Sequence, residues 1–217
     1  MKKLIERLKE LRKAECNILI VLIRFVYWMI FYKVKIIAHQ NVRIKNVKKI
    51  IQDTNDILYI GTQYVGFQLK NDRTLLNIQG ILHLKGSCNI KRGVRIDICE
   101  NGMLILGDNI RIANFTKIIA KNTVIIGNNT CIGWDCQIMD DNFHSIDYEN
   151  KKYKGSEIRI GDNVLIANKV SIYKSVNIAN GSVIASNSVI MENINDPNQL
   201  ITTNQRIKIL KQNVKWN

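Results

Sequence analysis

Hydrophobic residues recur at every sixth position along the C-terminal two-thirds of the chain. The clearest series has isoleucine at six consecutive hexad positions: Ile160, Ile166, Ile172, Ile178, Ile184 and Ile190. An earlier series runs through Leu106, Ile112 and Ile118 and resumes after a two-residue shift at Ile126, Ile132 and Ile138. A weaker one comprises Ile78, Leu84, Ile90 and Ile96. Six is a multiple of the two-residue repeat of a β-strand and does not match the 3.6-residue repeat of an α-helix. The pattern therefore predicts repeated short strands.

Turn residues stand between these strands. The triplets are GDN at 107–109 and 161–163 and GNN at 127–129, and NG follows at 180–181. Glycine and asparagine accept the backbone angles of tight turns. Three six-residue strands would make one triangular coil of about 18 residues, in which the hexad isoleucines point inward and stack on the next coil. The sequence predicts an all-β fold, a parallel β-solenoid.

The hexad pattern is interrupted between Ile138 and Ile160. The residues from 139 to 159 are polar and charged, MDDNFHSIDYENKKYKGSEIR. In a solenoid such an insertion protrudes as a loop from one edge of a coil. The stretch contains His144, one of the three histidines of the chain.

The N-terminal segment has a different pattern. Residues 1–16 place leucine and isoleucine on one face of a basic amphipathic helix, and residues 17–32 are strongly apolar. The apolar stretch is shorter than a membrane-spanning helix and contains Arg24 in its middle. A helix lying in a membrane surface is the favoured interpretation. A helix packed on its own domain or on a partner subunit, and a true span, are the alternatives.

Charge is concentrated in that segment. The chain has a net charge of +14, and residues 1–50 hold 13 Lys or Arg against 3 acidic residues, a net of +10. Such a segment meets an anionic surface, either lipid head groups or nucleic acid. No nucleic-acid-binding motif accompanies the charge, so nucleic acid is not an expected partner. We expect contact between residues 1–35 and the inner face of the cytoplasmic membrane.

The cysteines and histidines exclude other classes. Five scattered cysteines without CxxC spacing indicate neither a disulfide framework nor a zinc site, and they suit a reducing compartment. No convincing signal peptide follows the basic start, so a cytoplasmic location is expected. A metal enzyme on a β-helix needs three histidine ligands, but His39 and His83 lie outside the central hexads. No metal is expected.

Hexads of the form Ile-Gly-x-x-Ser/Val-x resemble those of the hexapeptide-repeat acyltransferases, over residues 76–208. Residues 132–147, IGWDCQIMDDNFHSID, are similar to a segment of sugar and capsular or O-antigen polysaccharide O-acetyltransferases. Ala113-Asn114-Phe115 is similar to the Ala-Asn-Phe of galactoside and maltose O-acetyltransferases, where that Asn also precedes the catalytic His by thirty residues. The resemblance implies a left-handed parallel β-helix, acetyl-CoA as co-substrate, and a homotrimer with active sites between subunits.

The resemblance also implies roles on the acceptor side. His144 would be the general base, because a hydroxyl attacks a thioester poorly until its proton is removed and histidine titrates near neutrality. Asn114 would hydrogen-bond a sugar hydroxyl, although a buried turn residue is a competing interpretation. Asp140 would either cap the loop or bind sugar hydroxyls. Trp134 would stack on a sugar ring or on the donor, or would form a trimer contact. Further substrate contacts are expected from Asn142 and Phe143.

On the donor side the expected residues are Ala167, Asn168, Lys169, Ser186, Arg206 and Lys208. A backbone N–H at Ala167-Asn168 would stabilise the negative oxygen of the transition state. Ser186 would meet the pantetheine arm. The three basic residues would either meet the phosphates or be ordinary solvated surface charges. Three departures from the family pattern fall on this side, Leu165 with Ala167, the Ala185-to-Ser188 stretch, and 203–208.

These expectations define three segments and one leading function. Residues 1–50 would be a helical N-terminal segment, 51–201 the β-helix acyltransferase domain, and 202–217 a C-terminal tail. The leading function is acetyl transfer from acetyl-CoA to a hydroxyl of a sugar in a cell-surface polysaccharide or its precursor. The alternatives are N-acylation of an amino sugar or nucleotide-linked sugar, and a non-catalytic trimeric scaffold.

Overall fold

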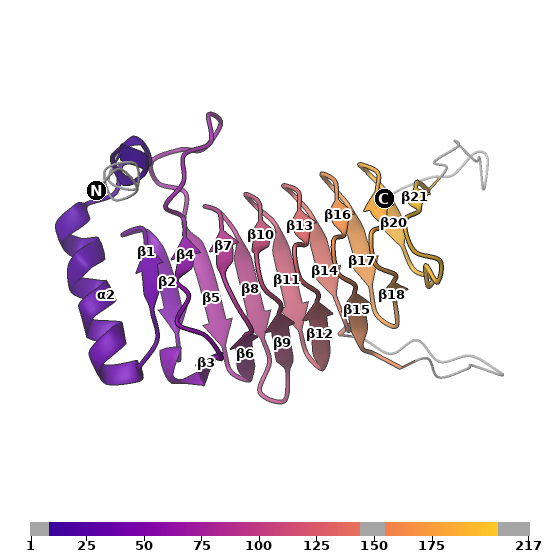
Figure 1. Cartoon of the computed structure of the whole chain (residues 1–217), viewed down its shortest axis with the longest axis horizontal. Coiled ribbons are helices and arrows are strands. Elements are labelled where there is room, and N and C mark those ends of the chain that lie inside the picture. The colour runs from indigo at the N-terminus through magenta and orange to yellow at the C-terminus, as the bar shows by residue number, and fades with distance from the viewer. Residues whose placement is uncertain (1–8, 144–154, 204–217) are drawn as a thin grey trace, which may run out of the picture.

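The computed structural model describes residues 9–143 and 155–203 and is a parallel β-helix (Figure 1). Successive strands pass to three different sheets, and each strand from β4 to β20 pairs in parallel with the strand three places before it. Sheet A contains β1 (Ile36–Ala38), β4 (Leu58–Ile60), β7 (Cys88–Ile90), β10 (Ile110–Ile112), β13 (Cys131–Ile132), β16 (Leu165–Ile166), β19 (Val183–Ile184) and β21 (Leu200–Ile201).

Sheets B and C complete each coil. Sheet B contains β2 (Val42–Lys45), β5 (Thr74–Ile78), β8 (Arg95–Ile98), β11 (Lys117–Ala120), β14 (Gln137–Met139), β17 (Ser171–Tyr173) and β20 (Val189–Ile190). Sheet C contains β3 (Ile50–Gln52), β6 (Ile81–Leu84), β9 (Met103–Leu106), β12 (Thr123–Ile126), β15 (Ile158–Ile160) and β18 (Asn177–Ile178). We name the turns that join them corner AB, corner BC and corner CA.

The hexad isoleucines form the core, as predicted. Ile132, Ile166 and Ile184 stand in register on sheet A, and the corresponding positions of sheets B and C are also aligned from coil to coil. All six isoleucines of the clearest series are buried. The parallel β-helix inferred from the six-residue period is therefore confirmed.

Corner CA shows why the GDN and GNN triplets suit these turns. The side chain of Asp108 accepts the backbone N–H of Ser87 at 2.8 Å, and Asn128 accepts that of Asp108 at 2.8 Å. The series continues toward the C-terminal end through Asp162 and Asn180, so each coil is hydrogen-bonded to the next. The third residue of each triplet has a positive φ, which asparagine tolerates.

The solenoid begins earlier than the sequence indicates. Strands β1, β2 and β3 form a first coil, with the 3-10 turn η1 (Val47–Lys49) before β3. Residue 50, the expected end of the helical segment, is the first residue of β3. The helical part ends at Tyr32, where the next residue, Lys33, adopts a left-handed conformation that terminates the helix.

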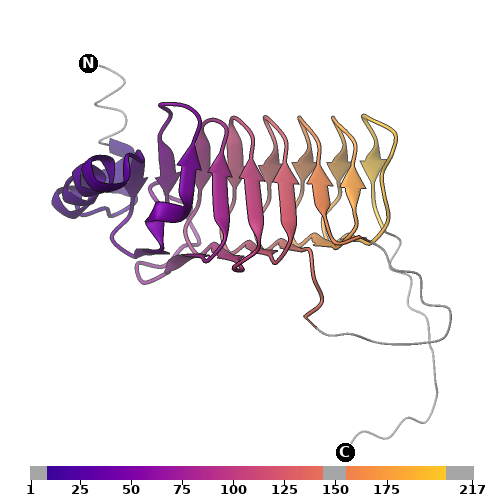
Figure 2. The same cartoon turned by 90° about the horizontal axis from the view of Figure 1, so that it is seen from below.

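Helix α2 (Ile18–Tyr32) closes the N-terminal end of the solenoid (Figures 1 and 2). Its side chains Val21 and Trp28 are buried. Arg24 reaches the first coil and donates hydrogen bonds to the carbonyls of His39, at 3.0 Å, and Val42, at 2.8 Å. Among the described residues, no helix is both long enough and apolar enough to cross a membrane. The inner side of α2 is therefore packed on the chain's own domain, which was one of the alternatives for this segment.

Candidate functional site

The structure separates the predicted site residues into two groups at opposite edges of sheet B. One group lies along corner AB and comprises Asn114, Trp134, Ala167, Asn168, Lys169 and Ser186. The other lies where the chain leaves β14 at corner BC and comprises Asp140, Asn142 and Phe143. His144, Arg206 and Lys208 are outside the described residues.

The two groups are far apart within one chain. Five residues separate Trp134 from Asp140, and three of them form β14, so the two residues lie at opposite ends of a strand of sheet B and at most about 20 Å apart. In Figure 1 the turns of corner AB line the upper edge of the solenoid, and the chain after β14 leaves at the lower edge. A site that uses both groups therefore needs more than one copy of the chain or a long reach of the inserted loop.

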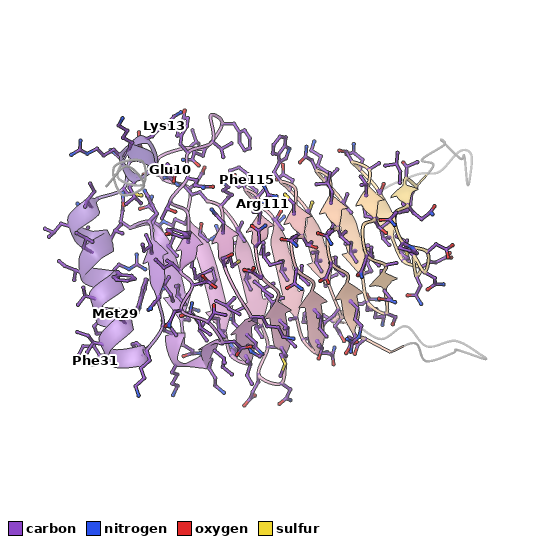
Figure 3. All side chains as sticks on the ribbon, viewed as in Figure 1. Glu10, Lys13, Met29, Phe31, Arg111 and Phe115 are labelled. Carbon is purple, nitrogen blue, oxygen red and sulfur yellow. The ribbon has the colours of Figure 1, made fainter. Side chains whose placement is uncertain are left out.

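Corner AB carries an aromatic cluster that the sequence did not reveal. The ring of Phe67 meets Trp134 edge to face, with 5.4 Å between centroids, and lies 6.1 Å from the ring of Phe115 (the labelled side chain at the upper edge in Figure 3). Phe67 and Trp134 are both exposed. Phe67 comes from 61–73, a second insertion between β4 and β5. The missing hexads in that stretch were the only signal of it.

Arg92 fixes this insertion on the solenoid. Its guanidinium is buried and donates hydrogen bonds to the carbonyl of Leu69, at 3.3 Å, and to that of Ala14. One buried cation thus joins the 61–73 insertion, the N-terminal segment and corner AB. The aromatic cluster consequently has a rigid support.

Asn114 lies inside the corner rather than on its surface. The side chain is buried, its Nδ2 has no hydrogen-bond partner among the described residues, and its carbonyl accepts the N–H of Asp135 at 3.0 Å. This placement favours the turn-residue interpretation over direct contact with a sugar.

The donor-side residues occupy two successive coils of the same corner. The N–H of Ala167 donates to the carbonyl of Ile184 at 2.9 Å and is therefore engaged in the coil ladder. Asn168 accepts the N–H of Trp134 through its side chain at 3.2 Å, while nothing among the described residues accepts its own N–H. Of the predicted pair, only Asn168 offers an oxyanion donor. Lys169 and Ser186 are exposed beside it.

Asp140 anchors the root of the His144 insertion. Its carboxylate is buried and accepts the backbone N–H groups of Lys121, at 2.7 Å, and Asn122, at 2.8 Å. Burial raises the pKa of Asp140, although the two N–H donors oppose this. Of its two predicted roles, the structure supports the loop cap, since the carboxylate has no exposed surface.

The next residues turn outward. The Phe143 ring is exposed, with Lys121 Nζ 5.4 Å from its centroid, and its N–H donates to Asp141 Oδ1 at 2.6 Å. Asp141 also pairs with Lys121 at 3.2 Å. Asn142 is half-buried between them. The chain therefore enters the insertion in a defined direction. Asp141 was not among the site residues predicted from the sequence.

Among the described residues, neither a metal-binding cluster nor a disulfide lies in either group. Within residues 9–143 and 155–203, no cluster of three or more His, Cys, Asp or Glu is positioned to hold a metal ion. The five cysteines are unpaired, and Cys136 packs under corner AB with its Sγ 3.0 Å from the carbonyl of Ala167.

Hexad coils in three parallel sheets, with an inserted loop at one corner, define a hexapeptide-repeat parallel β-helix protein. No known family profile matches the sequence. The chain is 35% identical over 168 residues to the "Uncharacterized 24.8 kDa protein in cps region" of Klebsiella pneumoniae, and the match covers 76% of this chain and 75% of that protein. The chain belongs to the family of that protein.

Two solved structures resemble the fold more distantly. The polysialic acid O-acetyltransferase OatWY matches with a TM-score of 0.41 and 22% identity, over 82% of this chain and 88% of its own. The polySia-specific acetyltransferase NeuO matches with a TM-score of 0.41 and 20% identity, over 84% of this chain and 83% of its own.

Proposed function

We propose that this protein is an acetyl-CoA-dependent O-acetyltransferase that modifies a sugar hydroxyl of a cell-surface polysaccharide or its precursor. One observation carries the proposal: the hexad series breaks at an insertion whose sequence resembles the acceptor motif, and Asp140 fixes the root of that insertion. The relative in a cps (capsule) region of Klebsiella pneumoniae supports a polysaccharide acceptor.

The separation of the two residue groups supports a site between subunits. The His144 insertion begins at corner BC, whereas Trp134 lies at corner AB of the same coil and Asn168 at corner AB of the next coil. In a homotrimer, the insertion of one subunit would face corner AB of its neighbour. A closed ring of three subunits would then hold three equivalent sites.

The reaction assigns a step to each side of this site. His144 takes the proton of the sugar hydroxyl as its oxygen attacks the carbonyl carbon of the thioester. The carbonyl oxygen becomes negative, and the N–H of Asn168 donates a hydrogen bond to it. Collapse of the intermediate breaks the carbon–sulfur bond, and the CoA thiolate takes the proton back from His144. The products are the sugar ester and free CoA.

The corner AB surface would hold both substrates. Trp134 and Phe67 present exposed aromatic surface, on which the apolar face of a sugar ring stacks. Ser186 borders the expected path of the pantetheine arm. Lys169 would approach the donor phosphates, as would Arg206 and Lys208 from the C-terminal tail.

The test is release of free thiol from acetyl-CoA in the presence of polysaccharide, with free amino sugars as the competing acceptor class. We expect thiol release with the polysaccharide and at least a thousandfold loss in His144→Ala, within the range for a lost catalytic base. His83→Ala is the matched control, since His83 pairs with Asp53 on sheet C, away from both groups. Full activity of His144→Ala would refute the mechanism, and a preference for amino sugars would indicate N-acylation.

A non-catalytic trimeric scaffold is the second candidate. The specific observation in its favour is that the N–H of Ala167 is engaged by Ile184, which leaves Asn168 as the remaining donor of the predicted pair. Isothermal titration with CoA separates the two candidates. Binding supports the enzyme, whereas a trimer that neither binds CoA nor releases thiol supports the scaffold.

A further inference from the structure

Helix α2 has its one charged residue on the inside and its apolar residues on the outside. Arg24 faces the solenoid, where its guanidinium lies 4.5 Å from the centroid of the Trp28 ring and bonds two carbonyls of the first coil. The outward side chains are large and exposed: Leu19, Ile20, Leu22, Ile23, Val26, Tyr27, Met29, Ile30, Phe31 and Tyr32. Solvent-facing helices have the opposite arrangement.

This outer face forms the end surface of the molecule. Figures 1 and 2 show α2 lying across the N-terminal end of the solenoid, with no other described element beyond it. Phe31, labelled in Figure 3, lies on the side of the helix away from the strands, and Met29 is also exposed. A contiguous apolar patch of this kind marks a site of contact with a protein or a membrane.

Basic residues border both ends of the face. Lys33 follows the C-terminal end of α2, and exposed Lys48 and Lys49 lie in η1, which packs against the helix. Exposed Arg12 and Lys13 precede its N-terminal end. Residues 9–49 hold ten Lys or Arg against two glutamates. An apolar face with a cationic border is complementary to anionic lipid, whereas a second copy would bring the same positive borders together.

A cavity at one end of the outer face also suits contact with anionic lipid. It has a volume of about 410 Å³ and lies between the C-terminal half of α2 and the first coil. Tyr27 and Tyr32 line one side, and Ile44, Val47 and Lys48 line the other. Tyrosine rings beside a lysine are typical of the boundary between acyl chains and phosphate head groups.

We propose that the outer face of α2 docks the protein on an anionic phospholipid surface, with the helix axis parallel to the membrane plane. Arg24 sets this orientation, because its bonds to the carbonyls of His39 and Val42 hold the opposite side of the helix against the solenoid. Docking would hold the solenoid against the membrane by its N-terminal end. The proposal does not depend on acetyl transfer, since lipid binding is measured without acetyl-CoA.

The experiment is co-sedimentation of the full chain with phosphatidylcholine vesicles, with and without phosphatidylglycerol. We expect binding only when phosphatidylglycerol is present, and weaker binding at high salt. Ile23→Ser with Ile30→Ser should lower the vesicle-bound fraction by about tenfold or more, because two exposed isoleucines that docking would bury in the lipid are removed. Met191→Ser with Leu200→Ser is the matched control at the other end of the solenoid, where both side chains are exposed.

A second variant tests the cationic border separately. Lys33→Gln with Lys48→Gln and Lys49→Gln should weaken binding about fivefold for each lysine near the surface. Sedimentation velocity of each variant tests whether the face instead binds a second copy of the chain. The proposal would be overturned if the wild-type protein bound neither vesicle type. It would also be overturned if replacing Ile23 and Ile30 dissociated an oligomer of the chain. Equal loss of binding in the Met191 and Leu200 control would overturn it as well.

Discussion

The ring of Phe67 contacts that of Trp134 edge to face, at 5.4 Å between centroids and an interplanar angle of 74°. These residues come from different coils. Phe67 belongs to the 61–73 insertion, whereas Trp134 stands in the turn between β13 and β14. The contact joins them into one exposed aromatic surface beside Asn168, whose side chain accepts the N–H of Trp134.

Loss of either ring should weaken binding of the acceptor. Phe67→Ala or Trp134→Ala removes an aromatic contact worth about 1 kcal/mol or more, so we expect the acceptor KM to rise roughly five- to tenfold with kcat little changed. Steady-state kinetics with varied polysaccharide measures this. Leu69→Ala, an exposed change in the same insertion, is the control. An unchanged acceptor KM in both aromatic variants would exclude the stacking role.

Asp140→Ala should destabilise the protein and misplace the insertion. The change leaves the N–H groups of Lys121 and Asn122 without their acceptor, at a cost of about 1–3 kcal/mol for each unsatisfied buried donor. Urea denaturation measures the loss. Asp141→Ala removes a partly exposed pair with Lys121 and an exposed acceptor for the Phe143 N–H, and it should cost less than about 1 kcal/mol. Similar losses in the two variants would mean that Asp140 is not an anchor.

A single hexad isoleucine should contribute about 2–5 kcal/mol to the free energy of unfolding. Ile166→Ala leaves a cavity between coils that stack Ile132 on one side and Ile184 on the other, so we expect a loss of about 2–5 kcal/mol. The adjacent Leu165 points outward and is exposed, and Leu165→Ala should cost under about 1 kcal/mol. The comparison uses denaturant midpoints. A larger loss at Leu165 would contradict the inward register of the hexads.

His39 should make the fold sensitive to acid. Burial, followed by the positive charge of Arg92, lowers the pKa of His39 to about 4, and its Nδ1 accepts the N–H of Asn41. Between pH 6.5 and 4, His39 is therefore protonated in the unfolded chain and neutral in the folded chain. The free energy of unfolding consequently falls as the pH falls. We expect about 2–3 kcal/mol across that window.

The matching variant is His39→Asn, which cannot titrate. Its unfolding free energy, measured by denaturant at pH 7 and at pH 5, should change less with pH than that of the wild type. An identical pH dependence in both proteins would show that His39 titrates normally in the folded state.

The fold could be read from the sequence where inward side chains repeat without interruption. Isoleucine at each hexad from 160 to 190 requires that every third strand stack on the last, and the observed register follows. The first coil does not show in the hexad pattern, because residues 39–41 and η1, rather than Gly-Asn turns, connect its strands. Its Ile36 and Ile50 are nevertheless buried like the later hexads.

The site was less predictable because it depends on contacts between coils. The motif comparison located the insertion, yet it could not show that Asp140 turns inward to bond Lys121 and Asn122 on the preceding coil. Phe67 could not be linked to Trp134 until the 61–73 insertion was known to lie along corner AB. The exposed face of α2 was suggested by its apolar run, whereas the inward direction of Arg24 required the first coil.

Subunit mixing tests most directly whether the His144 insertion of one chain works with corner AB of its neighbour. Two inactive variants are combined by unfolding and refolding: His144→Ala, and Ser186→Trp, whose indole would obstruct the donor path at corner AB. In randomly mixed trimers about a quarter of the sites join an intact insertion to an intact corner from different chains, so we predict recovery of about a quarter of wild-type thiol release. Mixed trimers, verified by mass, that remain inactive would contradict the account.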